Sequence, residues 1–282
     1  MQSLKVYQSL WATELRQPGK PESSEEKRFQ AIAEAGYSGV CLDPIVEEID
    51  ECLARKHLFQ RFGLECMINA FPKDDDGLKK LLDLSVEMDA TTFSVVGLVF
   101  PQTVAEAVPV VTKWIDIAKN MGADILFETH RNCLTNDMFL TSQLIREIPE
   151  MKLCADLSHY VVAHEFPMPI SDQHEELIEQ LLQRSESFQG RFASDQQIQT
   201  GFPQHAEWVD VFKSWWLRGF DFWRRNNDDE SNLVFLCELG PPPYAITDGN
   251  GRELSDRWIE ALSIKEWVEN TWCALNDQSV GD

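Results

Sequence analysis

Three acidic side chains interrupt apolar runs at positions where a carboxylate is costly to bury. Glu128, Asp156 and Glu238 each follow a run of three or more apolar residues. A carboxylate next to a protein core needs a compensating metal ion or hydrogen-bond donor. If the three acids share one small volume, at least one must hold a proton or a divalent cation must lie between them. The pattern indicates acid/base chemistry or a hard-cation site for Mn²⁺ or Mg²⁺, with Zn²⁺ as a third option.

Two histidines lie close to these acids in the sequence. His159 stands three residues after Asp156, and His130 stands two residues after Glu128. A neutral imidazole can bind a metal ion or accept a proton at physiological pH. We therefore expect His159 to contact a metal ion or a substrate oxygen. His130 is expected to line the same site, although a surface role for it stays open.

The elements that must position these residues alternate in type along the chain. Short apolar, β-branched runs predict strands, and amphipathic stretches between them predict helices. The predicted strands are Leu4–Leu10, Ser38–Asp43, Leu64–Ala70, Thr91–Leu98, Asp124–His130, Lys152–Leu157, Gly190–Asp195 and Leu233–Leu239. The predicted helices are Ser24–Ala35, Val46–Phe62, Asp75–Met88, Ala105–Met121, Thr135–Ile148, Asp172–Ser187, Ala206–Arg225 and Ser255–Leu275.

This alternation predicts parallel strand pairing, in an open sheet or a closed barrel. The barrel is favoured because no glycine-rich phosphate loop follows the first strand, as it would in a dinucleotide-binding fold. The polar residues of the later strands also lie at the carboxyl ends, which meet at one mouth in a barrel. We therefore expect one α/β domain over residues 1–282, a (β/α)8 TIM barrel, with residues 276–282 as a frayed tail.

The order of these residues resembles that of a known superfamily. Glu128, the Asp-x-x-His motif from Asp156 to His159, and Glu238 match the pattern of xylose isomerase-like TIM barrels. The stretch from Glu238 through the three prolines to Tyr244 is similar to the sugar phosphate isomerase/epimerase branch. The superfamily also contains sugar isomerases, ketose 3-epimerases, inosose dehydratases and type IV apurinic endonucleases.

The resemblance implies roles for individual residues. Glu128, Asp156, Glu238 and His159 would be metal ligands, with Mn²⁺ or Mg²⁺ as the expected ion. Glu128 and Glu238 would also flank the reacting carbon as an acid/base pair. The implied substrate is a small sugar or polyol, which His159 would contact directly or through the metal.

The sequence departs from the superfamily pattern at the seventh strand, where the family supplies a histidine ligand. The run from Gly190 to Gln197 contains no histidine. Arg191 or Phe192 lies near the expected position, and Asp195 or Gln197 could offer an oxygen instead, so occupancy by a metal is open. We expect Arg191 and Gln197 to contact the substrate, and Trp11, beyond the first strand, to stack on a sugar ring.

The amino-acid composition of the chain limits the kinds of partner that we expect. The 282 residues include 25 Lys and Arg against 47 Asp and Glu, a formal net charge of −22. Such a surface repels phosphate backbones and anionic membranes, so neither nucleic acid nor a membrane is an expected partner. The seven cysteines form no CxxC pair and are expected as buried free thiols in the cytoplasm. A homo-oligomer is compatible with the sequence.

The favoured function is therefore a metal-assisted sugar or polyol isomerase or epimerase. Proton transfer next to a carbonyl needs a base and stabilisation of the oxygen that becomes negative. The alternative from another class is a non-catalytic or metal-free sugar-binding barrel, because the strand-seven histidine is missing. An apurinic-endonuclease-like hydrolase and an inosose-type dehydratase are the further enzyme alternatives.

Overall fold

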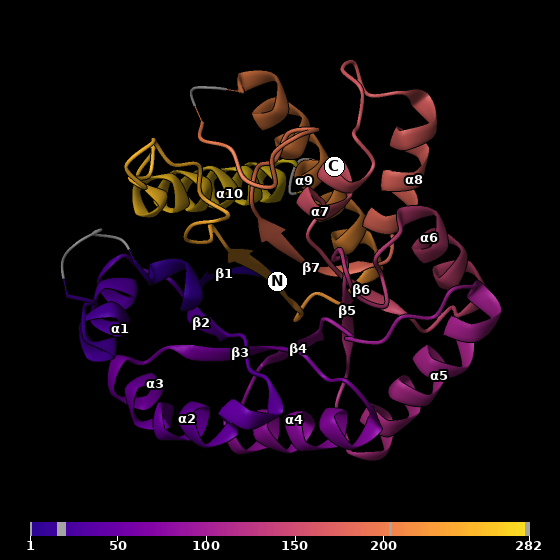
Figure 1. The fold of residues 1–282 in the computed structure, drawn as a ribbon, viewed down its shortest axis with the longest axis horizontal. Coiled ribbons are helices and arrows are strands. Elements are labelled where there is room, and N and C mark those ends of the chain that lie inside the picture. The colour runs from indigo at the N-terminus through magenta and orange to yellow at the C-terminus, as the bar shows by residue number, and fades with distance from the viewer. Residues whose placement is uncertain (1, 16–20, 203–204, 280–282) are drawn as a thin grey trace.

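Eight parallel strands form a closed barrel in the computed structural model, which describes residues 2–15, 21–202 and 205–279. The strands pair in chain order, and β8 pairs with β1 to close the ring (Figure 1). This confirms the predicted (β/α)8 TIM barrel. The strands are β1 (Ser3–Ser9), β2 (Gly39–Leu42), β3 (Glu65–Ala70), β4 (Thr92–Val95), β5 (Leu126–Glu128), β6 (Lys152–Ala155), β7 (Ser185–Gly190) and β8 (Asn232–Cys237).

Helices connect the strands and surround the barrel (Figure 1). Side chains cap several of them where the sequence offers an acceptor before the first turn: the Ser24 hydroxyl accepts from the backbone N–H of Lys27, and the Asp74 carboxylate accepts from that of Gly77. The helices are α1 (Glu25–Glu34), α2 (Ile49–Ala54), α3 (Lys56–Phe62), α4 (Asp75–Glu87), α5 (Val104–Asn120), α6 (Met138–Glu147), α7 (Ser158–Ala163), α8 (Asp172–Leu182), α9 (Ala206–Asn226) and α10 (Arg257–Ser279), with 3-10 turns η1 (Trp11–Thr13) and η2 (Val46–Glu48).

Apolar side chains pack in two layers. The larger layer joins the outer face of the barrel to the helices, and it includes Phe188 and Phe235 from neighbouring strands. A smaller cluster comes from alternate positions of the strands and fills the barrel interior. It consists of Tyr7, Cys41, Met67, Leu126, Cys154, Val234 and Leu236. This interior packing leaves space for a site only at an end of the barrel.

The seventh strand lies earlier than the sequence pattern indicated. The predicted strand Gly190–Asp195 is wrong, because β7 covers Ser185–Gly190 and the predicted helix over Asp172–Ser187 ends at Leu182. The sequence of β7, SESFQG, has one apolar side chain, Phe188, which packs towards the helices. Its polar side chains made it look like the end of an amphipathic helix.

Several other boundaries also differ from the expected ones. The predicted helix Val46–Phe62 is divided into η2, α2 and α3, and α7 forms just after β6 where no helix was predicted. Helix α10 continues to Ser279, so it includes the start of the expected tail, and residues 280–282 lie outside the described part of the chain. All seven cysteines are free, and all except Cys273 are buried. No helix in the described ranges combines the length and apolar character needed to cross a bilayer.

Candidate active site

Four ionisable side chains lie at the carboxyl ends of consecutive strands. Glu128 is the last residue of β5, and Asp156, Arg191 and Glu238 directly follow β6, β7 and β8. All four are buried. The barrel brings these carboxyl ends to one mouth, as the fold requires. The three predicted acids therefore lie around one volume, with Arg191 among them.

The Arg191 guanidinium connects two of the acids. Its Nη2 lies 2.9 Å from Oδ2 of Asp156 and 2.5 Å from Oε2 of Glu238, and its Nε donates to the same Asp156 oxygen at 3.3 Å. The carbon at the centre of the guanidinium is 4.8 Å from the centre of the Tyr244 ring, a cation–π distance. Burial alone would lower the pKa of Arg191, but the two carboxylates raise it. The guanidinium is therefore a permanent cation at the mouth.

Glu128 has only neutral hydrogen-bond partners. Its Oε2 accepts from Nδ2 of Asn69 at 2.6 Å and from Nε2 of Gln189 at 2.8 Å. Oδ1 of Asn69 accepts from the Ser94 hydroxyl at 2.8 Å, which fixes the orientation of the amide. Burial and the Asp156 charge raise the pKa of Glu128 to about 8. Its surroundings therefore favour the protonated form of Glu128 when no further cation is bound.

Two further carboxyls in this region also favour protonation. Burial raises the pKa of Glu238 well above its usual value, and the adjacent Arg191 opposes that shift. Burial raises the pKa of Asp43, which directly follows β2, to about 6, against hydrogen bonds from Asn69 and Ser9. With Asp156, the mouth holds four carboxyl groups around the guanidinium, and it therefore has a strong tendency to hold protons or a further cation.

Asp156 and the two histidines lie side by side. Oδ1 of Asp156 accepts from the backbone N–H of Ser158 at 3.0 Å and from its hydroxyl at 2.5 Å, at the start of α7. His159 is fully buried, and its Nε2 lies 3.5 Å from Oδ2 of Asp156. Neither ring nitrogen of His159 has a hydrogen-bond partner among the described residues. Burial lowers the pKa of His159 and lowers that of His130 to about 4, so both rings are neutral.

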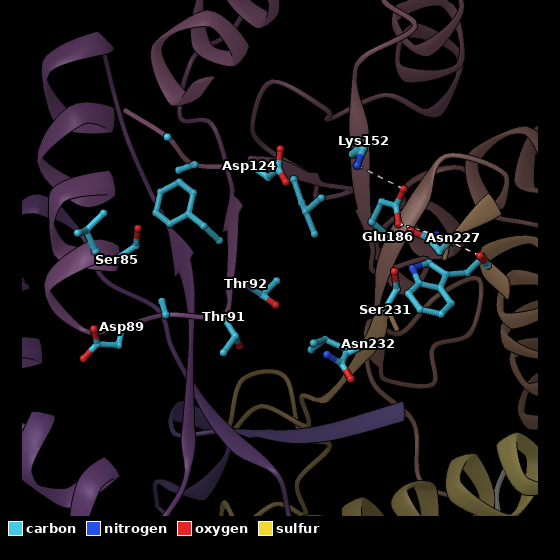
Figure 2. A pocket seen from close by; sticks show the side chains of 18 residues that line it. Ser85, Asp89, Thr91, Thr92, Asp124, Lys152, Glu186, Asn227, Ser231 and Asn232 are labelled. Atoms are coloured by element: carbon cyan, nitrogen blue, oxygen red, sulfur yellow. Dashed lines mark hydrogen bonds and ion pairs between the residues drawn. The ribbon is translucent and has the colours of Figure 1, made fainter. Parts of the chain in front are cut away.

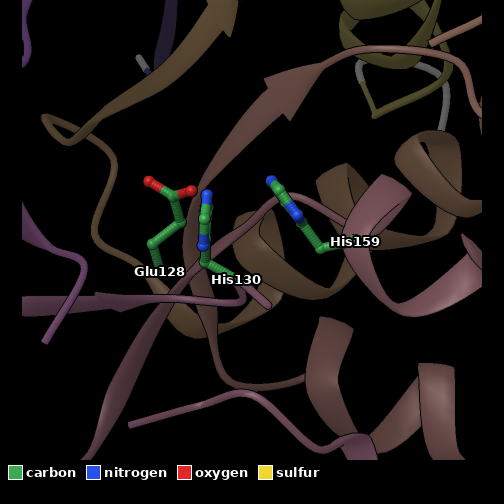
Figure 3. A group of neighbouring side chains, drawn as sticks. All are labelled: Glu128, His130 and His159. Atoms are coloured by element: carbon green, nitrogen blue, oxygen red, sulfur yellow. The ribbon is translucent and has the colours of Figure 1, made fainter. Parts of the chain in front are cut away.

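One group of donors in the described ranges could hold a metal ion. Ligand atoms of Glu128, His130 and His159 lie within 4.8 Å of one another (Figure 3). A carboxylate and two neutral imidazoles are a suitable donor set for a divalent ion, and the unpartnered nitrogens of His159 fit that role. The two rings lie against each other in a tilted arrangement, with centroids 3.8 Å apart and planes at 40°. Because imidazole lone pairs lie in the ring plane, one ring would turn when both bind the same ion.

This group overlaps only in part with the predicted ligands. It shares Glu128 and His159 with them and adds His130, which was expected to contact the substrate. Asp156 and Glu238, also predicted as ligands, instead bond to Nη2 of Arg191. The four predicted ligands therefore do not surround one open position, because a guanidinium lies against two of them.

A cavity of about 340 Å³ opens beside these residues. Its volume is at the lower end of the roughly 300–1,000 Å³ typical of small-molecule sites, which suits a small polar ligand. Trp11 and Phe71 provide apolar wall, and the Trp11 ring meets the Tyr244 ring edge to face at 5.1 Å. The full lining is Trp11, Asp43, Asn69, Phe71, Glu128, His130, Arg191, Glu238 and Tyr244.

The predicted substrate contacts are distributed unevenly over this cavity. Trp11, His130 and Arg191 line it, whereas His159 is buried beside Asp156 and is not part of its wall. Gln197 is also absent from the lining. It lies exposed in a turn, where its backbone N–H donates to the Ser194 hydroxyl at 3.1 Å.

Four residues of the site were not predicted from the sequence. Asp43 and Asn69 stand at or near the carboxyl ends of β2 and β3, and their polar character within apolar strands was a usable signal. Gln189 was missed because β7 was predicted too late in the sequence. Tyr244 was part of the matched motif but received no role, and in the structure it lies between Arg191 and Trp11.

A second hollow lies near the amino ends of the strands (Figure 2). Its wall includes Thr92 at the start of β4 and Asn232 at the start of β8. Glu186 there contacts Lys152 at 3.6 Å and accepts from Asn227 at 3.1 Å. Active sites of TIM-barrel enzymes lie at the carboxyl ends of the strands, which is the opposite end of the barrel, so this hollow is not the candidate active site.

Comparisons with known proteins support the fold. No protein-family model and no curated protein matches the sequence. Among solved structures, a xylose isomerase-like TIM barrel protein from Mycobacterium smegmatis in complex with magnesium is 14% identical, with a TM-score of 0.60 and coverage of 95% of this chain and 97% of that chain. D-allulose 3-epimerase from a Methylomonas species in complex with D-allulose is 16% identical, with the same TM-score and coverage.

A third structure, a sugar phosphate isomerase/epimerase from Parabacteroides distasonis, is 12% identical at a TM-score of 0.60 and covers 95% of this chain and 94% of its own. Other matching structures are described as a probable dehydratase and as an AP endonuclease of family 2. At these identities the likeness concerns the fold. The chain therefore has the fold of the xylose isomerase-like TIM barrels, as the resemblance in its sequence predicted.

Proposed function

We propose that the protein is an isomerase or epimerase that moves a proton at a carbon next to the carbonyl of a small sugar or of a ketone derived from a polyol. The supporting observation is that Glu128 and Glu238, two carboxyl groups with different partners, line the same cavity. Proton removal by one group and proton return by the other is epimerisation. The sugar epimerases and isomerases among the similar structures agree with this class of reaction.

The different surroundings of the two carboxyls suggest their roles. Glu238 bonds to a permanent cation, Arg191, which lowers its pKa, while burial has the larger effect and raises that pKa well above its usual value. Glu128 has no such contact, and burial and the Asp156 charge raise its pKa to about 8, which favours the protonated form. We assign Glu238 as the base because its bond to Arg191 stabilises the carboxylate, the form that accepts a proton, and we assign Glu128 as the acid that returns one. The reverse reaction exchanges the two roles.

We further propose a divalent ion as cofactor, with Mn²⁺ or Mg²⁺ expected from the resemblance to the superfamily and Zn²⁺ compatible with the donors. Glu128, His130 and His159 would hold it. When bound, such an ion supplies Lewis-acid polarisation of a carbonyl oxygen. Independently of the ion, Trp11 and Phe71 shield one side of the cavity from water and offer faces on which a sugar ring can pack.

The same acid/base pair could also drive loss of a hydroxyl group, because dehydration begins with the same proton removal. The products separate these reactions: an epimerase or isomerase conserves the mass of the substrate, whereas a dehydratase releases water. We favour isomerase or epimerase chemistry because a second carboxyl, Glu128, is placed to return the proton.

The test is turnover of a panel of aldoses, ketoses and polyol ketones, free and phosphorylated, followed by NMR. The wild-type protein should convert at least one member to a product of equal mass. E128Q and E238Q should each lower kcat by about 10²–10⁴-fold. Q197A, which alters an exposed residue outside the cavity, should retain the wild-type rate. Saturable binding of a sugar without turnover in the wild type would instead indicate a non-catalytic barrel.

A further inference from the structure

Arg191 is bonded on one side and open on the other. Its Nε and Nη2 contact Asp156 and Glu238, but Nη1 has no hydrogen-bond partner among the described residues. The side chain is 2% exposed and lines the cavity. A buried N–H group without a partner is unfavourable and uncommon in folded proteins. The open nitrogen is therefore a place where an oxygen atom of a ligand would be bound.

The guanidinium also fills the position between two of the predicted metal ligands. Nη2 lies 2.9 Å from Asp156 and 2.5 Å from Glu238, so these oxygens already have a positive partner. A divalent ion bound to the same oxygens would lie within a few ångströms of the guanidinium, and two such charges in a buried site repel strongly. The Tyr244 ring packed against Arg191 further fixes the guanidinium in this place.

From these contacts we propose that Arg191 replaces a divalent ion between Asp156 and Glu238 and provides the site with a built-in cation. Asp156 and Glu238 are then not metal ligands in this protein. Nη1 donates to the substrate oxygen that becomes negative when the neighbouring carbon loses its proton. This last step rests on the proposed function, whereas the replacement of the ion does not.

A guanidinium suits this task for two reasons. It keeps its charge at every pH at which the protein is folded, so it does not take up the proton that Glu238 removes. Its donors also lie in a rigid plane, so the bonds from Nε and Nη2 to Asp156 and Glu238 set the direction of Nη1. Arg191 is thereby oriented by the carboxylates whose charge it balances.

The replacement of the ion is tested without a substrate, by titration of Mn²⁺ followed by EPR. In the wild-type background, E238Q should leave Mn²⁺ affinity unchanged within about twofold, because Glu238 does not bind the ion. R191H removes the guanidinium and offers an imidazole, and it should raise Mn²⁺ affinity at least tenfold. Adding E238Q to R191H should then abolish that gain.

The matched control is R218H. Arg218 also lies between two carboxylates, Glu175 at 2.5 Å and Glu179 at 3.7 Å, but about a third of its side chain is exposed, outside the mouth. R218H should therefore produce no gain in Mn²⁺ affinity. Circular dichroism and melting temperature establish that each variant is folded. A tenfold loss of Mn²⁺ affinity in the E238Q single variant, or no gain of affinity in folded R191H, would overturn the proposal that Arg191 replaces a divalent ion.

The donation from Nη1 is tested by turnover, once a substrate is found. R191M should lower kcat at least 100-fold with KM changed less than fivefold, because the contact strengthens as the oxygen becomes negative. R191K keeps the charge and should recover part of that loss. Equal loss in R191K and R191M, or a kcat within threefold of the wild type in R191M, would contradict the donation. If the wild type turns over no sugar, the proposed function is wrong. The Mn²⁺ titration needs no substrate, so it still decides whether Arg191 replaces the ion.

Discussion

Glu128 illustrates how a single buried side chain can link stability to pH. Burial and the Asp156 charge raise its pKa to about 8, far above the value of about 4.3 for an unfolded chain. Between these two pH values the unfolded chain has lost the proton and the folded protein keeps it. The stability that this group contributes is therefore fully present below about pH 4 and is lost as the pH rises through 8.

We predict that E128Q removes this dependence. In the wild type the free energy of unfolding should fall by up to about 1.4 kcal/mol per pH unit from this residue between pH 5 and 8. The melting temperature of E128Q relative to the wild type should then rise over that pH range. E147Q, at an exposed helix position, is the control, and its melting temperature should change with pH in the same way as that of the wild type. A constant difference between E128Q and the wild type would show that Glu128 is ionised in the folded protein.

Individual site residues could be predicted from the sequence where their type contrasted with their surroundings. Glu128, Asp156 and Glu238 stand out because each is an acid after an apolar run, and all three lie at the mouth. The role of Arg191 could not be inferred in the same way. Its contacts with Asp156 and Glu238 join three strands and depend on the rotamer that the closed barrel allows.

At the level of elements, β7 shows where pattern recognition fails. Gln189 donates to Glu128 at the site, and the neighbouring interior position is Ser187, so β7 lacks the apolar run that marks the other strands. A strand that serves the site loses the hydrophobic signal by which strands are found. The prediction therefore moved β7 to the next apolar stretch, although it still placed Arg191 near a strand end.

The loop after β8 is held against the rest of the mouth by close contacts. The Gln199 side chain accepts from the backbone N–H of Gly240 at 2.8 Å and donates to its carbonyl at 3.1 Å. A Cβ atom on Gly240 would lie 2.1 Å from a ring carbon of Trp11. Gly240 therefore allows Trp11 to form the cavity wall beside Glu238.

We predict that G240A displaces Trp11 and destabilises the protein by about 1–3 kcal/mol, the usual cost of overpacking. The displacement should also raise KM for the substrate, since Trp11 forms part of the cavity. The measurement is urea unfolding of G240A, W11A and the double variant. The double variant should be less destabilised than the sum of the two single changes. Additive effects would contradict the steric argument.

The barrel architecture was easier to predict from the sequence than the boundaries of its elements or the shape of its cavity. Eight strand-like runs alternating with amphipathic stretches leave few arrangements for a parallel sheet, and the closed barrel is one of them. Closure depends on the number and order of the strands, so it tolerated an error of several residues in β7 and the division of one predicted helix into η2, α2 and α3. The cavity depends on side-chain positions and was not predictable in this way.

The charge of the whole molecule gives a prediction about the hydrolase alternative. A net charge of −22 opposes the approach of a polyanion, and the repulsion has its longest range at low salt. We predict that the protein neither retards nor cleaves duplex DNA with an abasic site at about 10 mM salt, with or without added Mn²⁺ or Zn²⁺. Gel electrophoresis measures both effects. Cleavage that is lost in E238Q would favour the endonuclease class.

In the proposed reaction, Glu238 and Glu128 exchange protons with a carbon next to a carbonyl. In such a pair the proton removed and the proton returned belong to different carboxyls, so the returned proton comes from solvent. The most direct measurement is NMR of the substrate in D₂O with the wild-type protein and E238Q. Deuterium should enter at that carbon in the wild type and about 10²–10⁴-fold more slowly in E238Q. Product formed without deuterium, or exchange at the same rate in both proteins, would show that Glu238 and Glu128 do not exchange protons with the substrate carbon.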